Sequence, residues 1–291
     1  MKKAYILAAI TIFLWSSMAT VSKLLLNTLD SFSVLCISAL FAALFLLIIN
    51  VATGNIKNLR NYKPKDIFTI ILIGLPGTFF YYIFYYLGAS DMPASQAFII
   101  NYLWPIMSVV FACIILHEKM TVKKAVAIVM SFAGVIIVTG SGLMSFNKNM
   151  LLGALLCICG AVSYGLFTAL NQKFYYEKRI SMMINYFVTF ILTTVINSAT
   201  GNLFLPTPAQ VGGFAWNGIF TVAIANTAWA VALESGKTAK ISNLAYITPF
   251  LSLVWTSLIL KEELSPWSVI GLTVIVGGIL IQLTDKKQNK I

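Results

Sequence analysis

Long apolar segments alternate with short polar connections along the whole chain. Ten segments of about 20 residues each are almost free of charged residues, and they lie at residues 4–27, 32–53, 67–88, 94–116, 123–141, 150–171, 181–200, 213–233, 240–260 and 266–283. A helix that crosses a bilayer needs about 20 mostly apolar residues. The pattern therefore predicts an all-α polytopic membrane protein with ten transmembrane helices.

The composition agrees with a membrane protein. Of the 291 residues, 59% are apolar and 10% are charged, and the mean hydropathy is +0.89. Soluble domains average roughly 45–50% apolar and about 25% charged residues. The start, Met-Lys-Lys before an apolar run, resembles a signal peptide, but the run is too long and has no clear cleavage site. We interpret it as the first spanning helix.

Positive charge is distributed asymmetrically between the two sides of the predicted membrane. With the N-terminus inside, 17 of the 20 lysines and arginines fall on inner segments, and the others are Lys23, Lys148 and Lys261. Positively charged loops stay in the cytoplasm, so we expect both termini to be cytoplasmic in a multi-pass protein of a bacterial-type inner membrane. The net charge of +11 needs no nucleic-acid partner, since topology and anionic lipids account for it.

The chain also repeats itself. At an offset of 144 residues, four pairs coincide: Tyr102 with Tyr246, Pro105 with Pro249, Glu118 with Glu262, and Gly134 with Gly278. Residues 15–23 parallel residues 164–172 at an offset of 149. We predict two five-helix repeats, residues 1–142 and 143–291. Because five is odd, the second repeat enters the membrane from the opposite side, as in the inverted repeats of secondary transporters.

Two stretches resemble a known family. These are N-Y-L-W-P-I-M-S-V-V-F-A-C-I-I-L-H-E-K-M, residues 101–120, and A-Y-I-T-P-F-L-S-L-V-W-T-S-L-I-L-K-E-E-L, residues 245–264. They are similar to the repeated EamA domain of the drug/metabolite transporter superfamily. N-Y-L-W-P, together with Tyr81 and Tyr85, resembles the aromatic amino acid exporter branch. The resemblance implies a basket-shaped helical carrier with a central cavity that exports amino acids and related metabolites.

Polar and aromatic residues interrupt the fourth apolar segment. Pro105 should bend the helix, because proline removes a backbone hydrogen bond and clashes with the preceding turn. Asn101 and Trp104 share one helix face, and Tyr102 borders it. We expect these three residues to line a cavity, where rings and amides bind a substrate. The alternative is an interfacial aromatic belt, but their position near mid-segment disfavours it. Tyr246 and Pro249 repeat the arrangement in the second half.

Four tyrosines in the third segment form two pairs at i, i+4 spacing. Spacing alone does not decide which pair faces inward. The family resemblance favours Tyr81 and Tyr85 as cavity residues, which leaves Tyr82 and Tyr86 for lipid or the interfacial belt. Four further residues are expected in the substrate site because they lie on mixed aromatic and polar faces or in the aligned repeat: Trp15, Tyr164, Asn226 and Trp229.

The seventh segment has a polar stripe with a simpler explanation. Its members follow one another in steps of four: Asn185, Thr189, Thr193 and Asn197. Residues four apart share a helix face, and hydrogen bonds between packed helices account for such a stripe.

The ionisable residues restrict the substrate. All nine acidic residues fall at predicted helix ends or in loops, and buried acids are the usual proton-coupling groups of membrane carriers. We therefore expect a zwitterionic or neutral substrate. Glu118 and Glu262 each precede the next helix, so stabilisation of the helix dipole explains them. Lys23 either extends to the outer surface or contacts a substrate carboxylate.

Other functional classes find no support in the sequence. The four cysteines show no metal-ligand or disulfide pattern, and His117 is the only histidine. We predict no enzyme activity, no cofactor and no metal. The predicted function is secondary transport by alternating access, which exports amino acids, aromatic ones among them, or facilitates their movement. Because two five-helix repeats make a complete unit, we expect a functional monomer. The alternative is an exporter of drug-like or quaternary ammonium cations.

Overall fold

The computed structural model describes residues 2–144, 148–174, 176–202, 204–235 and 244–284. Within these ranges the chain forms helices and no strands. Eight helices are long and apolar enough to span a membrane, and Ala245–Leu260 is a shorter apolar helix. The prediction of an all-α polytopic membrane protein is confirmed at this level.

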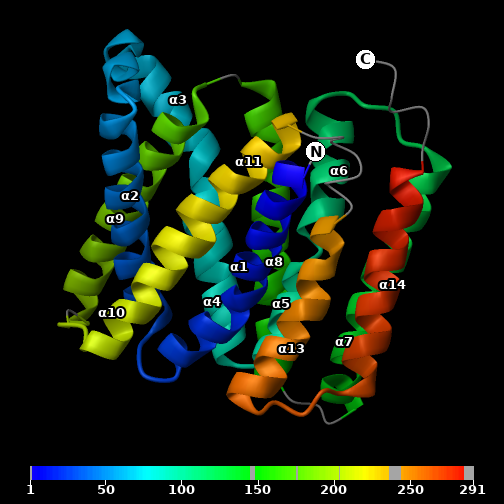
Figure 1. Cartoon of the computed structure of the whole chain (residues 1–291). Coiled ribbons are helices and arrows are strands. Elements are labelled where there is room, and N and C mark those ends of the chain that lie inside the picture. The colour runs from blue at the N-terminus through cyan, green and yellow to red at the C-terminus, as the bar shows by residue number, and fades with distance from the viewer. Residues whose placement is uncertain (1, 145–147, 175, 203, 236–243, 285–291) are drawn as a thin grey trace.

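The helices follow one another as the apolar pattern predicts (Figure 1). In the first part of the chain they are α1 (Lys2–Leu26), α2 (Ser31–Ala52), η1 (Asn55–Asn61), α3 (Pro64–Leu75), η2 (Pro76–Phe80), α4 (Tyr81–Ser90), α5 (Ala94–Asn101), α6 (Trp104–Ile115) and α7 (Val122–Met144). In the second part they are α8 (Lys148–Lys173), α9 (Lys178–Thr200), α10 (Pro208–Ala215), η3 (Trp216–Ile224), α11 (Ala225–Ser235), η4 (Ala245–Ile247), α13 (Thr248–Leu260) and α14 (Pro266–Leu283).

Short polar side chains begin several of these helices. The Asp30 carboxylate accepts hydrogen bonds from the backbone N–H groups of Phe32 and Ser33 at the start of α2. Thr207 and Gln210 form a capping box at the start of α10. Such caps satisfy N–H groups that have no partner inside the helix.

Both repeated prolines follow a break in a helix. Pro105 lies in the first turn of α6, after a turn that ends α5 at Asn101. Pro249 lies in the first turn of α13, after the short 3-10 helix η4. Proline lacks the N–H group that would continue a preceding helix. The fourth apolar segment is therefore divided into α5 and α6, which together form the candidate span Ala94–Ile115.

Two π-helical segments interrupt corresponding helices. η2 joins α3 to α4, and η3 joins α10 to α11. π-Helical turns are rare and often occur at functional sites. The apolar pattern did not predict them, because a wider turn leaves the sequence apolar throughout.

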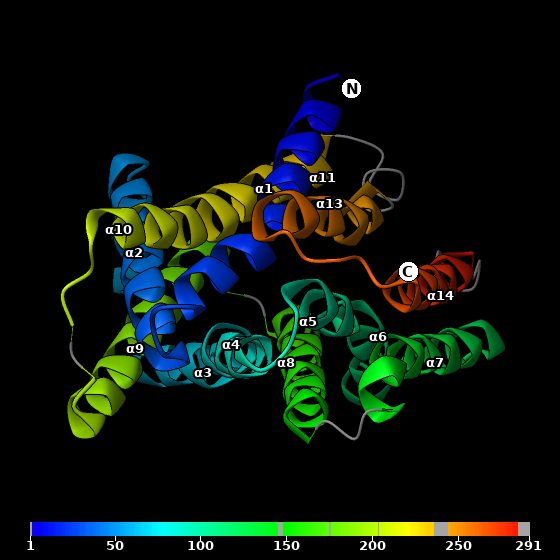
Figure 2. The ribbon, with the colours of Figure 1, turned by 90° about the horizontal axis from the view of Figure 1, so that it is seen from below.

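Helices from the two parts of the chain pack on each other in matching pairs (Figure 2). α2 packs on α9, and α7 packs on α14. α8 packs on α4 and α6, while α1 packs on α11 and α13. Small residues allow close approach of α7 and α14: a Cβ atom on Gly134 would lie 2.7 Å from the Gly271 carbonyl oxygen, and one on Gly278 would lie 3.0 Å from that of Ala127.

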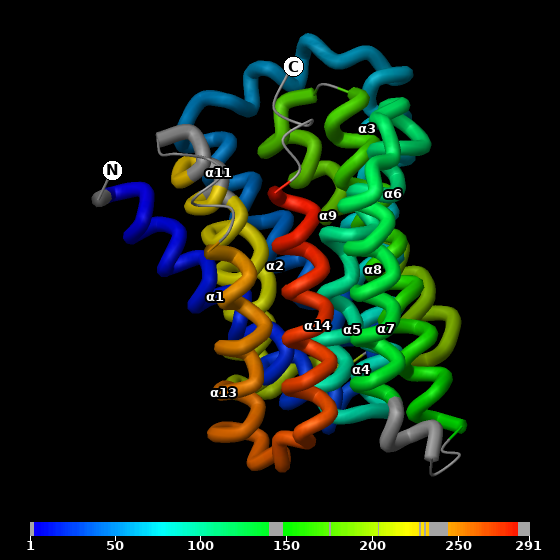
Figure 3. Tube along the Cα trace, turned by 90° about the vertical axis from the view of Figure 1, so that its right-hand side faces the viewer, coloured from blue at the N-terminus to red at the C-terminus, as the bar shows by residue number. Residues whose placement is uncertain are grey.

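Different segments of the chain lie at the two ends of the bundle (Figure 1). The first turns of α1 and the last turns of α14 lie toward the same end (Figures 1 and 3). There the Lys123 ammonium donates a hydrogen bond to the Thr284 carbonyl at 2.9 Å. The α4–α5 connection and the end of α13 lie toward the opposite end (Figure 1).

Candidate functional site

An array of aromatic rings runs through the packed helices. Trp104 of α6 makes an edge contact with Tyr164 of α8, with ring centroids 5.1 Å apart. Tyr164 lies 4.7 Å from Tyr81, and Tyr81 lies 4.8 Å from Tyr82 on α4. Tyr82 in turn lies 6.5 Å from Tyr186 on α9. The array therefore connects helices from both parts of the chain.

A buried amide lies beside this array. Asn101 Nδ2 donates a hydrogen bond to the Tyr81 hydroxyl oxygen at 2.9 Å. Asn101 is 2% exposed and Tyr81 is 8% exposed. The Asn101 Oδ1 atom has no hydrogen-bond partner among the described residues, and neither does the hydroxyl of Tyr85. Since the Tyr81 oxygen accepts from Asn101, its own proton remains available as a donor.

Tyr102 connects the array to the break before α13. Its hydroxyl donates to the Ala245 carbonyl oxygen at 2.7 Å. Tyr246, the next residue, is half-buried and packs against the main hydrophobic core. The two aligned tyrosines, Tyr102 and Tyr246, therefore lie in neighbouring segments.

The remaining predicted site residues form a second group. The rings of Trp15 on α1 and Trp229 on α11 lie 5.3 Å apart, and both residues are half-buried. Asn226 of α11 donates to the Val222 carbonyl oxygen of the preceding segment η3 at 2.6 Å. Among the described residues, no ring contact joins this group to the array around Tyr81. The structure thus brings Tyr81, Tyr85, Asn101, Tyr102, Trp104 and Tyr164 together, whereas Trp15 and Trp229 contact each other.

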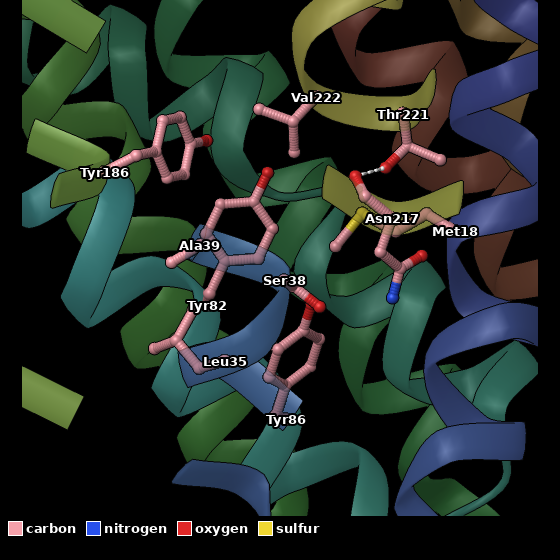
Figure 4. Close-up of a pocket in the computed structure, with 10 residues that line it drawn as sticks. All are labelled: Met18, Leu35, Ser38, Ala39, Tyr82, Tyr86, Tyr186, Asn217, Thr221 and Val222. Atoms are coloured by element: carbon pink, nitrogen blue, oxygen red, sulfur yellow. Dashed lines mark hydrogen bonds between the residues drawn. The ribbon is translucent and has the colours of Figure 1, made fainter. Parts of the chain in front are cut away.

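A small pocket adjoins the aromatic array at Tyr82 and Tyr186 (Figure 4). It is formed by residues of α1, α2, α4, α9 and η3, which are Met18, Leu35, Ser38, Ala39, Tyr82, Tyr86, Tyr186, Asn217, Thr221 and Val222. None of these side chains is charged. Figure 4 shows the Tyr86 hydroxyl pointing toward Ser38. Asn217 donates to the Ser22 hydroxyl, but its buried Oδ1 atom has no hydrogen-bond partner in the part of the chain that the structure describes.

The residues that line the pocket include two tyrosines that we expected at the lipid or the interfacial belt, and two residues that we did not predict. Tyr86 is only 1% exposed and Tyr82 is half-buried, so the expectation of a lipid-facing belt is wrong for this pair. The reason is that α4 is enclosed, with α2, α8 and α1 packed around it. Asn217 and Tyr186 were missed, although an amide within an apolar segment is a signal that the sequence does contain.

The polar stripe of α9 behaves as helix-packing residues do. Asn185 Nδ2 donates to the Ile70 carbonyl of α3 at 3.2 Å. The Thr189 hydroxyl donates to the Thr78 hydroxyl of η2 at 3.2 Å. For these two residues the interpretation as interhelical hydrogen bonds is confirmed. Thr193 instead donates to a carbonyl of its own helix.

Lys23 has backbone partners that the sequence did not predict. Its ammonium donates to three backbone carbonyls at the end of α4 and beyond it, those of Ala89 at 2.6 Å, Ser90 at 3.3 Å and Met92 at 3.0 Å. These carbonyls form the electronegative end of a helix. The lysine therefore binds backbone of its own protein, rather than extending free to the surface.

The two aligned glutamates have different partners. The Glu118 carboxylate pairs with the Lys124 ammonium at 2.8 Å. The Glu262 carboxylate accepts from the backbone N–H groups of Ala94 at 2.7 Å and Ser95 at 3.0 Å. Glu262 thus stabilises a helix N-terminus as expected, but the helix is α5 and not the next one in the sequence.

The described residues offer no group of three or more His, Cys, Asp or Glu side chains that could hold a metal ion. The four cysteines are free, and Cys157 is buried beside Gly88. The chemistry available at the aromatic array is therefore hydrogen bonding and ring contact by uncharged groups.

Comparison with known proteins places these features in a family. The model of the EamA-like transporter family matches residues 2–140 and residues 151–284. The uncharacterized transporter YvbV of Bacillus subtilis is 26% identical over 84% of this chain and 80% of its own. An uncharacterized transporter of Clostridium kluyveri is 25% identical over 100% of this chain and 96% of its own.

One relative has a stated substrate. The aromatic amino acid exporter YddG of Ancylobacter novellus is 23% identical over 79% of this chain and 81% of its own. A protein of known crystal structure superposes with a TM-score of 0.69 at 20% identity, covering 97% of this chain and 96% of the other. That superposition shows a shared fold.

Proposed function

Because this chain belongs to the EamA-like transporter family, we propose that it is a secondary transporter that moves amino acids, including aromatic ones, by alternating access. The described part of the chain has eight candidate membrane spans, and its relatives are transporters by name. Transport by relatives supports transport here.

The topology that we propose has ten spanning helices in two inverted repeats, residues 1–142 and 143–291, with both termini in the cytoplasm of a bacterial-type inner membrane. The matching helix pairs support it, since α1 contacts α11 and α13 as α8 contacts α4 and α6. The concentration of lysine and arginine on one side also supports it. Two repeats would make a complete carrier, so we propose a functional monomer.

The hydrogen bond from Asn101 to Tyr81 is the observation that favours an amino acid. It leaves one buried acceptor, Asn101 Oδ1, and one buried donor, the Tyr81 hydroxyl. A zwitterion has one ammonium to donate and one carboxylate to accept. An uncharged donor and acceptor side by side match such a ligand without adding net charge to the site. The rings of Trp104 and Tyr164 would contact its side chain.

The likeness to the exporter YddG supports the same substrate class. The second candidate is a drug-like or quaternary ammonium cation, which the aromatic faces favour. A cation would need only the acceptor Asn101 Oδ1 and the aromatic faces. The Tyr81 hydroxyl donor would then have no acceptor on the ligand.

Competition in proteoliposomes separates the two candidates. Labelled phenylalanine is offered together with an excess of unlabelled phenylalanine, phenethylamine, 3-phenylpropionate or phenyltrimethylammonium. We expect only phenylalanine to compete fully, because each analogue lacks the ammonium or the carboxylate. Full competition by both cations, with none by 3-phenylpropionate, would support the cation exporter and contradict the amino-acid proposal.

A further inference from the structure

Glu262 connects two parts of the chain that are far apart in sequence. Both of its carboxylate oxygens accept hydrogen bonds at the start of α5, one from Ala94 N and one from Ser95 N. Hydrogen bonds to a carboxylate are stronger than those between neutral groups. The positive end of the α5 dipole adds to the attraction. Glu262 therefore fastens the end of α13 to the start of α5.

The backbone before Glu262 is strained. Lys261 has a φ of 56°, in the left-handed region that side chains other than glycine disfavour. The N–H groups of both Lys261 and Glu262 then donate to the Thr256 carbonyl at the end of α13. His117, the residue aligned with Lys261 at the offset of 144, also has a φ of 56°. Among the described residues, these two are the only non-glycine residues with positive φ.

Strained residues persist where the surrounding structure holds them, and they often mark elements with two states. Here the left-handed residue turns the chain so that the following glutamate reaches another helix. The two hydrogen bonds that Glu262 accepts thus offset the conformational strain at Lys261.

Lys23 holds the same connection from its other side. Its ammonium binds the carbonyls of Ala89, Ser90 and Met92, at the negative end of α4. The connection between α4 and α5 is therefore fixed by one cation from α1 and one anion beyond α13. Its two helix ends receive the charges that their dipoles favour.

We propose that Lys23, Glu262 and residues 89–95 form a latch that closes this end of the protein, and that the latch opens whenever the substrate site is exposed at this end. The proposal rests on the alternating access proposed above. It makes Glu262 a positioning residue, because it acts on α5 and not on the substrate. α5 runs from Ala94 to Asn101, so a movement of its N-terminus would also displace Asn101 in the proposed substrate site.

The opposite end of the protein has an ion pair in place of the latch. Glu118 pairs with Lys124, a residue of its own half. The residue aligned with Lys124 is Ser268, which has no charge for Glu262. Glu262 depends instead on N–H groups of another helix. Loss of its charge should therefore weaken the closure of the latch end in particular.

Thiol labelling measures this closure without any substrate. Ala97 is 0% exposed and lies one turn beyond the N–H groups that Glu262 binds. A reporter chain contains Cys36→Ser, Cys113→Ser, Cys157→Ser, Cys159→Ser and Ala97→Cys. In intact proteoliposomes or cells, a membrane-impermeant maleimide reacts with position 97 only when the latch end is open. We expect Glu262→Gln to raise the labelling rate at least fivefold.

Glu263→Gln is the matched control, because Glu263 is the adjacent carboxylate and is exposed. It should leave the labelling rate unchanged. If Glu262→Gln is not monodisperse in detergent, Lys23→Met tests the other half of the latch and should also raise the rate. Equal labelling of the reporter chain and a folded Glu262→Gln or Lys23→Met variant would overturn the latch.

The experiment distinguishes failure of the latch proposal from failure of the proposed function. Faster labelling of Glu262→Gln without transport of any amino acid would retain the latch and reject the substrate. Phenylalanine transport with unchanged labelling would retain the substrate and reject the latch.

Discussion

Asn101 and Tyr81 form a buried pair of uncharged groups, with Nδ2 of the amide 2.9 Å from the phenol oxygen. The pair joins α5 to α4 next to the rings of Tyr164 and Trp104. Buried polar groups normally have their hydrogen bonds satisfied. The Asn101 Oδ1 atom has no partner among the described residues, which makes it the best candidate for a contact with substrate.

Asn101→Leu tests this pair. The change removes the free acceptor and also the bond that orients Tyr81, so we expect the KM for phenylalanine to rise about tenfold, equivalent to about 1.4 kcal/mol. Uptake into proteoliposomes measures it. Ser108→Ala is the control, because the Ser108 hydroxyl donates only to the Trp104 carbonyl of its own helix. An unchanged KM in folded Asn101→Leu protein would remove Asn101 from the site.

Trp104→Ala tests the aromatic array. Trp104 is half-buried and contacts Tyr164 at 5.1 Å. Loss of its ring should weaken transport of phenylalanine more than that of threonine, since only phenylalanine has a ring to contact it. We expect the ratio of the two kcat/KM values to fall at least fivefold. Trp267→Ala, at a tryptophan that is 53% exposed, should leave the ratio unchanged; a similar fall there would show an indirect effect.

Lys124→Met tests the ion pair at the other end. The Lys124 side chain is 3% exposed, and its loss leaves the Glu118 carboxylate without this partner. Breaking a buried pair costs about 3 kcal/mol, so we expect the Tm in detergent to fall by several degrees. The neighbouring Lys123 is exposed, and Lys123→Met should change the Tm far less. Equal effects would mean that burial of the pair contributes little.

Gly134→Leu tests the packing of α7 on α14. A Cβ atom at Gly134 would lie 2.5 Å from Ile275 Cγ1 and 2.7 Å from the Gly271 oxygen, so the helices must separate. Overpacking of this kind costs about 1–3 kcal/mol. We expect a lower Tm and less folded protein in detergent. Gly277→Ala is the control, since its nearest neighbour, Met130 Cε, lies at an ordinary 3.6 Å. A normal Tm for Gly134→Leu would show that this contact is loose.

The spacing of apolar residues was sufficient to predict most of the helices. Helix starts such as Pro266, after Ser265, follow from local chemistry that the sequence displays directly. The π-helical segments η2 and η3 did not follow, because a change from one helical hydrogen-bond pattern to another leaves the apolar pattern unaltered. Pro105 predicted a bend, and the structure has a helix break just before it and just before Pro249.

The site was harder to predict because it depends on which helices meet. The i, i+4 spacing separates Tyr81 and Tyr85 from Tyr82 and Tyr86, but it cannot show that neighbouring helices cover both faces of α4. The partner of Glu262 lies 168 residues away. A helix-dipole role could be inferred from its position, whereas the identity of the helix required the fold.

Counterflow tests the central claim most directly. Proteoliposomes at equal pH on both sides are loaded with unlabelled phenylalanine, and labelled phenylalanine is added outside. The account predicts a transient accumulation of label that Asn101→Leu strongly reduces, because a carrier exchanges substrate without a proton gradient. Folded wild-type protein that gives no accumulation above that of empty liposomes would contradict it.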